Sequence, residues 1–353
     1  MEAHTFVRNA WYVLGLSEEF AGGRLHGQAI AGKPLVMWRS ASGQVVAFDG
    51  RCLHKRMPLK EGKLLPDDIL ECAYHGLCYD AEGRCVRVPA HPEGRIPAAW
   101  KLKAYPLVEQ DGVVWVWSGD PDKIGNVCPP RTPEIGSTEW ETISSGPMAV
   151  AANYRLLIEN LLDITHFYPL HDGNIGDIAN SRIPVEIVKE DIGGNQTVKT
   201  VRHATQYKQP PYFADWFGYD VVDRYHTHHL MNPGLTRVQL RVAPPGQLGT
   251  DAERGYVLYH THTPVDQTHL IWRWILNCRV EHRAGAQPSR SLARFIAETF
   301  PVVVDQDRWV LERQQEMFGY PDEGYSEVHV KTDKALLVAR KILAALEKHE
   351  QAR

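Results

Sequence analysis

Residues 52–75 read CLHKRMPLKEGKLLPDDILECAYH and contain two short motifs with related patterns. The first is Cys52-Leu-His54, and the second, Cys72-Ala-Tyr-His75, follows after seventeen intervening residues. Each motif supplies one thiolate and one imidazole, so two hairpin loops can hold a [2Fe–2S] cluster with two Cys on one iron and two His on the other. A structural zinc site also accepts two Cys and two His, but zinc fingers usually pair Cys with Cys and His with His. The spacing therefore favours the cluster over zinc.

The sequence around these motifs predicts a small β-domain. Between residues 30 and 117, short apolar stretches such as PLVMWR, QVVAFDG and GVVWVWSGD are broken by Gly, Asp and Pro, which is typical of antiparallel strands. Residues 119–138 contain four prolines and no periodicity, which indicates a linker. We therefore predict an N-terminal [2Fe–2S] domain over residues 1–125 and a second, catalytic domain over residues 126–353.

The second domain is predicted to be α+β. Residues 153–167 have helical spacing, residues 185–280 alternate as strands do, and residues 289–315 and 331–349 are again helical. This order indicates a central antiparallel sheet with helices at both ends.

Composition narrows the possible partners and the compartment. A formal net charge of −4 gives no indication of binding to nucleic acid or to an anionic membrane. No apolar run approaches the roughly 20 residues of a membrane helix, and MEAHTFVRNAWYV lacks the pattern of a signal peptide. We expect a cytoplasmic protein. Its six cysteines are too sparse for a disulfide scaffold, and four of them lie between residues 52 and 85, which points to metal. Cys78 and Cys85 are expected to be small buried residues.

A second candidate metal site lies in the run Asn160-Leu-Leu-Asp163-Ile-Thr-His166-Phe-Tyr-Pro-Leu-His171. On a continuous helix Asn160, Asp163 and His166 would fall within about 120° of one face. Pro169, two residues before His171, is expected to turn the chain, so that the imidazoles of His166 and His171 converge. Two neutral His and one carboxylate form the facial triad of non-heme Fe(II) oxygenases, whereas a His pair alone is equally consistent with ordinary buried histidines.

Taken together, RCLHKRMPLKEGKL, CAYHGLCYDAEGRC and NYRLLIENLLDITH resemble the Rieske non-heme iron oxygenases, and among them the aromatic O-demethylases. One departure is Lys55, since the family commonly has Arg directly after the first His. The family's third iron ligand is an Asp on a late helix, where PVVVDQDRWVLERQQE offers Asp305 and Asp307. The register of ERQQ favours Asp307.

The resemblance also assigns roles to Asn160 and Asp163, the two catalytic candidates. Asp163 would not bind iron; its carboxylate would orient a ligand imidazole. It would also bridge His166 to the cluster ligand His75 of a neighbouring subunit in a head-to-tail ring, usually a homotrimer.

The function that the resemblance implies is that of a terminal oxygenase component. A reductase with flavin and a ferredoxin-type iron–sulfur centre would pass electrons from NAD(P)H to the cluster and then to one mononuclear Fe(II), where O₂ reacts. The expected substrate is a small aromatic acid that undergoes O-demethylation. Ring hydroxylation and attack on an arenesulfonate are alternatives within the same chemistry. A Rieske electron-transfer protein, the alternative of another class, would need only the first domain.

Other histidines and tryptophans are weaker candidates. By resemblance, His260 is expected to contact the substrate carboxylate. The tract His226, His228 and His229 is split across two faces by strand alternation, so structural or surface roles are expected. Trp272 and Trp274 are expected in the core.

Overall fold

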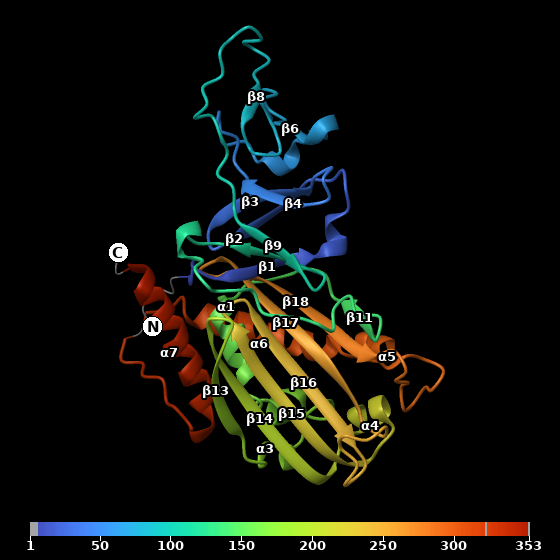
Figure 1. The fold of residues 1–353 in the computed structure, drawn as a ribbon. Helices are drawn as coiled ribbons and strands as arrows, with labels where there is room; N and C mark the ends of the chain where they lie inside the picture. The colour runs from blue at the N-terminus through green and yellow to red at the C-terminus, as the bar shows by residue number, and fades with distance from the viewer. Residues whose placement is uncertain (1–5, 322, 352–353) are drawn as a thin grey trace.

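The computed structural model describes residues 6–321 and 323–351 and shows a small β-domain above one end of a large sheet (Figure 1). The predicted combination of an N-terminal β-domain with an α+β catalytic domain is confirmed. The bounds predicted at residues 1 and 353 lie outside the described residues, and the division at 125/126 stays a prediction. Within the described residues, no helix is long and apolar enough to cross a membrane.

The N-terminal domain consists of three antiparallel sheets. Their strand orders are β1(Trp11–Leu16)-β10(Val113–Trp117)-β9(Leu107–Gln110), β2(His26–Ile30)-β3(Lys33–Arg39)-β4(Val45–Asp49) and β5(Lys63–Leu65)-β6(Ile69–Glu71)-β7(Cys78–Tyr79)-β8(Cys85–Arg87). Short 3₁₀ helices connect them: η1(Ser17–Phe20), η2(Leu59–Glu61) and η3(Pro66–Asp68). The predicted linker, residues 119–138, contains only η4(Pro121–Lys123), and Trp11 Nε1 donates to Val127 O at 2.8 Å, so this segment packs against the domain.

The second domain is built on an eight-stranded antiparallel sheet. Its order is β11(Trp140–Ser144)-β18(His269–Arg279)-β17(Arg254–Asp266)-β16(Leu235–Ala243)-β15(Val221–Asn232)-β14(Asn195–Lys208)-β13(Glu186–Ile192), and β12(Met148–Val150) also pairs with β18. Strands β13 to β18 match the predicted range of residues 185–280, whereas β11 and β12 precede it and were not predicted.

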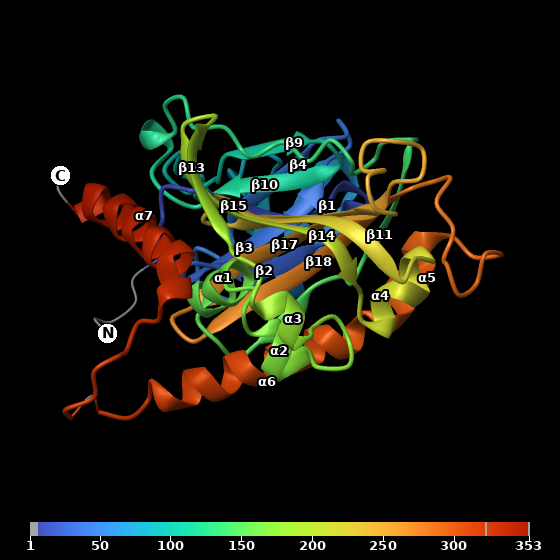
Figure 2. The same ribbon diagram turned by 90° about the horizontal axis from the view of Figure 1, so that it is seen from below.

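Helices cover one face of this sheet, as Figure 2 shows for α1 to α6, while α7 lies along the β13 edge. Their bounds are α1(Tyr154–Leu162), α2(Phe167–His171), α3(Ile178–Ser181), α4(Pro211–Phe217), α5(Leu292–Thr299), α6(Pro301–Met317), η5(Lys331–Asp333) and α7(Lys334–Gln351). The helices expected at both ends of the sheet therefore lie over one of its faces, except α7, which lies at its edge.

Strand alternation explains how the sheet packs on both faces. In β18, Trp272 and Trp274 point to the helical side and lie in its core, as predicted, whereas Ile275 points to the other side. Ile275 there packs with Trp11 and Trp115 of the N-terminal domain. The same apolar rows therefore stabilise both the helical layer and the contact between the domains.

Candidate metal centres and active site

The two loops that carry the Cys and His motifs have matching backbones. Cys52 N–H donates to Met57 O at 2.9 Å, and Cys72 N–H donates to Leu77 O at 2.8 Å. Each loop is closed by a residue in the left-handed region, Arg56 with φ of 57° and Gly76 with φ of 70°. The two motifs are therefore presented by equivalent turns, as a cluster held from two sides requires.

Within these loops, the cysteines are buried and the histidines are exposed. Cys52 and Cys72 are each 2% exposed, whereas the rings of His54 and His75 face solvent with their centres 4.4 Å apart. This arrangement fits a cluster with its thiolate-bound iron inside and its imidazole-bound iron at the surface. Among the described residues, His54 and His75 thus form an exposed edge through which an electron can enter or leave.

Tyr79 is a neighbour of the cluster loops that sequence reasoning missed as a functional residue. Its hydroxyl accepts from Leu53 N–H at 3.2 Å and lies 3.2 Å from Cys52 Sγ. Since hydrogen bonds to the sulfurs help set the potential of such clusters, Tyr79 is placed to raise it. Cys78 and Cys85 are buried, as expected, and Cys78 Sγ is 3.1 Å from Arg87 Nε.

The predicted continuous helix over residues 153–167 is wrong beyond Leu162. Asp163 leaves the helical conformation, and its Oδ1 accepts from both the backbone N–H and the hydroxyl of Thr165, which stabilises the break. The predicted turn at Pro169 is also wrong, because this proline is the third residue of α2. In the first turn of a helix its missing N–H has no intrahelical partner to lose.

His166, His171 and Asp307 meet in one place. Asp307 Oδ1 lies 3.5 Å from His166 Nε2 and 3.2 Å from His171 Nε2, and the three candidate ligand atoms are all within 4.8 Å of one another. Both Nε2 atoms are buried and have no hydrogen-bond partner. Asp305, the alternative acid, is exposed and pairs with Arg308 at 3.1 Å. The geometry thus fits a metal ion at Asp307, although its role as a ligand stays a prediction.

The other nitrogen of each imidazole faces an acceptor. His171 Nδ1 is 2.9 Å from Gln306 Oε1, and His166 Nδ1 contacts the backbone carbonyl of Asp163. Because both partners are acceptors, each Nδ1 carries the proton and each Nε2 keeps a lone pair for metal. The carbonyl of Asp163 therefore orients His166, while the role expected for the Asp163 carboxylate stays a prediction. Gln306 was missed.

The electrostatics of this centre keep the carboxylate ionised and an imidazole neutral. Burial lowers the pKa of His166. Burial alone would raise the pKa of Asp307, but the nearby imidazoles of His171 and His166 and the hydrogen bond from Asn160 together lower it. Asp307 and His166 are thus in the charge states that bind a divalent metal.

A narrow cavity of about 30 Å³ lies beside this centre. From the sheet it is lined by His226, His228 and His260. Because the first two are buried, the surface alternative among the structural or surface roles expected for them does not hold. Their alternation across the strand leaves His229 on the other face, within 3.9 Å of Glu190.

The tautomer of His260 follows from its neighbour. Trp272 Nε1 lies 3.0 Å from His260 Nδ1, and an indole can only donate, so the remaining proton of neutral His260 is on Nε2. Burial lowers the pKa of His260 to about 4, which keeps it neutral near pH 7. The contact between His260 and a substrate stays a prediction.

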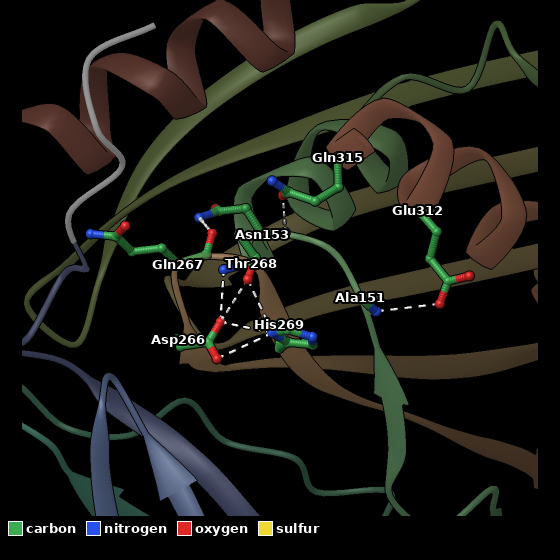
Figure 3. A network of polar contacts seen from close by, with 8 residues as sticks. All are labelled: Ala151, Asn153, Asp266, Gln267, Thr268, His269, Glu312 and Gln315. Carbon is green, nitrogen blue, oxygen red and sulfur yellow. Dashed lines mark hydrogen bonds and ion pairs between the residues drawn. The ribbon is translucent and has the colours of Figure 1, made fainter. Parts of the chain in front are cut away.

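A polar network holds α6 against the start of α1 (Figure 3). Asn153 N–H donates to Gln315 Oε1 at 2.8 Å, and Ala151 N–H donates to Glu312 Oε1 at 3.3 Å. The Asn153 side chain also donates from Nδ2 to Gln267 O at 2.7 Å, which adds the β17–β18 turn. The network therefore fixes Asp307, on α6, relative to the histidines that follow α1.

Comparison with known proteins agrees with both centres. Residues 10–106 match the Rieske [2Fe-2S] domain, and residues 150–349 match the vanillate O-demethylase oxygenase C-terminal domain. The chain belongs to the Rieske non-heme iron oxygenases. Rieske oxygenases of this kind are oxidoreductases that contain a [2Fe–2S] cluster and a mononuclear iron. The match over residues 150–349 does not favour an electron-transfer protein of the first domain alone.

Several relatives of this Rieske oxygenase are similar to part of the chain or to nearly all of it. The oxygenase component of dicamba O-demethylase from Stenotrophomonas maltophilia is 37% identical over 190 residues, which span 53% of this chain and 54% of that protein. The iron–sulfur subunit of a toluene-4-sulfonate monooxygenase system from Comamonas testosteroni is 28% identical over 98% of both chains. A crystal structure of dicamba monooxygenase bound to 3,6-dichlorosalicylic acid superposes with a TM-score of 0.87, at 26% identity, covering 99% of this chain and 100% of that one. Relatives named as components imply a separate reductase.

Proposed function

We propose that this Rieske oxygenase holds its mononuclear Fe(II) on His166, His171 and Asp307. The observation that carries the proposal is the pair of buried, unpartnered Nε2 atoms that face one oxygen of Asp307. Two imidazoles and one carboxylate leave further coordination positions open, and iron bound there would supply the activation of O₂. The [2Fe–2S] cluster would be held by Cys52, His54, Cys72 and His75.

The proposed reaction is O-demethylation of a small aromatic acid. One oxygen atom of O₂ is inserted into a C–H bond of the methoxy group, and the other leaves as water with two electrons and two protons. The hemiacetal product then breaks its C–O bond to give a phenol and formaldehyde. The names of the dicamba and vanillate relatives support this reaction. The toluene-4-sulfonate relative, which covers nearly the whole chain, supports oxidation of an arenesulfonate as the second candidate.

The chain's own residues would prepare the site for this reaction. Gln306 and the carbonyl of Asp163 hold the two imidazoles, and Asn160 holds the carboxylate. His260 would offer its Nε2–H to an acceptor on the substrate. Phe300 and Tyr256 line the same cavity and would exclude water from the substrate ring.

We further propose a homotrimer served by a flavin- and iron–sulfur-containing reductase that uses NAD(P)H in the cytoplasm. In the trimer, Asp163 would bridge His166 to His75 of the partner subunit. Exposed apolar side chains support such a head-to-tail contact. Tyr74 lies beside His75, and Val302 and Trp309 lie seven residues apart on α6, hence on one face outside the iron site.

The function is tested by oxygen consumption of the iron-loaded protein with a generic reductase and NADH. The substrates are methoxylated, sulfonated and plain aromatic acids, and formaldehyde is assayed in parallel. Formaldehyde that matches O₂ uptake on a methoxybenzoate is the expected result. Uptake without formaldehyde would instead assign ring hydroxylation or desulfonation.

The iron ligands are tested by a matched pair of variants on one helix. Asp307→Ala should lose iron and turnover, whereas Asp305→Ala, at the exposed position, should keep both. The reverse result would reject Asp307 as the ligand. Asp163→Asn should keep both metals and lose nearly all turnover if the carboxylate carries electrons between subunits.

A further inference from the structure

Two arginines on neighbouring strands are buried on the side of the sheet that faces the iron site. Arg202 on β14 and Arg224 on β15 are 3% and 2% exposed. Arg202 Nη1 donates to Asn180 Oδ1 at 3.0 Å and to Ile164 O at 3.5 Å, and Arg224 Nη2 donates to His226 Nδ1 at 3.3 Å. None of these partners carries a negative charge. The charges of Asp163 and Asp177 act on Arg202, and that of Asp177 also acts on Arg224, but among the described residues no hydrogen bond or ion pair joins either acid to these arginines. Since buried cations are normally paired, the two guanidinium groups thus lack a direct anionic partner.

The donor atoms that remain free lie together. Nε and Nη2 of Arg202, Nη1 of Arg224 and Nδ2 of Asn180 are all buried without a hydrogen-bond partner. Asn180 is 1% exposed and already bonded to Arg202, and Arg224 is paired across the strands with Ala204, two residues from Arg202 on the same face, so these residues belong to one cluster. Nε and Nη2 form the edge of a guanidinium that binds a carboxylate through two parallel hydrogen bonds. The cluster therefore has the composition of an anion site.

This anion site lies directly behind the cavity wall. Because arginine can only donate, His226 accepts at Nδ1 and carries its proton on Nε2, 3.1 Å from His228 Nε2. Both imidazoles line the cavity beside Asp307. On the other side of the cluster, Ile164 is two residues from His166. Burial and then His228 lower the pKa of His226, and the charges of Arg224 and Arg202 lower it further, so the positive potential reaches the wall.

We propose that Arg202, Arg224 and Asn180 bind the anionic group of the substrate, a carboxylate or a sulfonate. The inference rests on the proposed function and names the group that the substrate must carry. A cavity of about 30 Å³ is smaller than an aromatic ring, so a wall side chain has to move, and His226 is the one that separates the cavity from Arg224. An anion held there directs the opposite end of the ring toward the iron.

The test measures binding by calorimetry on the iron-loaded protein, without reductase or NADH. The probes are 4-methoxybenzoate, toluene-4-sulfonate and the neutral 4-methoxybenzamide. We expect at least one anion to bind roughly ten- to a hundredfold more tightly than the amide, as charge-assisted hydrogen bonds imply. The stronger of the two anions identifies the natural group.

Variants test whether the preference for the anions over the amide depends on the two arginines. Arg202→Gln and Arg224→Gln should each remove most of it and leave binding of the amide unchanged, while Arg202→Lys, which keeps the charge and loses the fork, should be intermediate. Arg241→Gln is the control, since Arg241 pairs with Glu253 away from the cavity. The visible spectrum of the [2Fe–2S] cluster and the iron content report whether each variant is folded. The anion preference of the wild-type protein tests the inference even if a variant fails to fold.

The outcomes separate the inference from the proposed function. Equal binding of acid and amide, or no binding of either anion, overturns the inference even if turnover occurs and assigns the arginines to the chain's own Asp163 or Asp177. Equal losses in Arg202→Gln and Arg241→Gln overturn it too. A clear anion preference without oxygen consumption would uphold the inference while the proposed function fails.

Discussion

Asn160 donates a hydrogen bond from Nδ2 to Oδ1 of Asp307 at 3.0 Å, and the same oxygen faces Nε2 of both His166 and His171. One amide therefore controls the direction of the carboxylate. We expect Asn160→Ala to let the carboxylate rotate and to weaken iron retention by roughly tenfold, as changes behind a metal ligand do. Residual iron after dialysis against a chelator measures this. Unchanged iron in Asn160→Ala would show that the carboxylate is held by other contacts.

Gln306 controls the neighbouring ligand. Gln306→Leu removes the acceptor of His171 Nδ1–H, and we expect iron affinity to fall roughly ten- to a hundredfold. Gln306→Glu keeps an acceptor and is the matched control. The idea is wrong if Leu and Glu give the same iron affinity in competitive chelator titrations.

Trp272 should matter through the proton of His260. Trp272→Phe keeps the aromatic packing and removes the donor to His260 Nδ1, so the proton of His260 is free to move to that nitrogen. We expect the KM for an aromatic acid to rise severalfold, which corresponds to the free energy of about one hydrogen bond, while kcat stays close to wild type. Nitrogen NMR of labelled histidine reports the tautomer directly. A KM change without a tautomer change would indicate packing instead.

The network of Figure 3 should contribute to stability as well as to geometry. Asn153 caps α1, since its Oδ1 accepts from Arg155 N–H, and it also binds Gln267 O. Asn153→Ala should therefore destabilise the catalytic domain by about 1–2 kcal/mol. The melting temperature measures the loss. Glu316→Ala, at a residue whose carboxylate pairs with Arg313 on the surface of the same helix, should change it little.

Acid should destabilise the sheet through buried neutral histidines. Burial lowers the pKa of His262 from 6.5 to about 3, so between those values the unfolded chain binds a proton that the folded chain does not. Stability is full above about pH 6.5 and falls toward pH 3, by on the order of 4 kcal/mol for this residue. His262→Gln should flatten the dependence of the melting temperature on pH. His91→Gln, at an exposed position, should leave the slope as it is.

Most of the architecture could be predicted because it follows from short-range patterns. The Cys and His spacing, the alternation in residues 185–280 and the amphipathic C-terminal segment all depend on residues close in sequence. Asp307 could be preferred over Asp305 from a family register, and the structure adds a physical reason. Asp307 falls in the buried stripe of α6 with Val303, Val304 and Leu311.

The details that failed depend on contacts between distant segments. Nothing in the sequence places Gln306 against His171, 135 residues earlier. The break after Leu162 depends on how Asp163 bonds Thr165, which competes with helix that propensity alone would continue. A signal for Arg202 and Arg224 was available, since each is a charged residue on the inward side of its strand. His226 and His228, for which structural or surface roles were expected, lie on the same side.

The attachment of α6 at Glu312 and Gln315 fixes where Asp307 lies along the helix and which way its side chain points. From Asp307 to Gln315 the chain advances eight residues, about 12 Å along the axis, and one added or removed residue would turn the carboxylate by about 100°. Insertions between these positions should therefore abolish iron binding even if the protein still folds. The length of this segment, and not only its composition, should be constrained in any working copy of the enzyme.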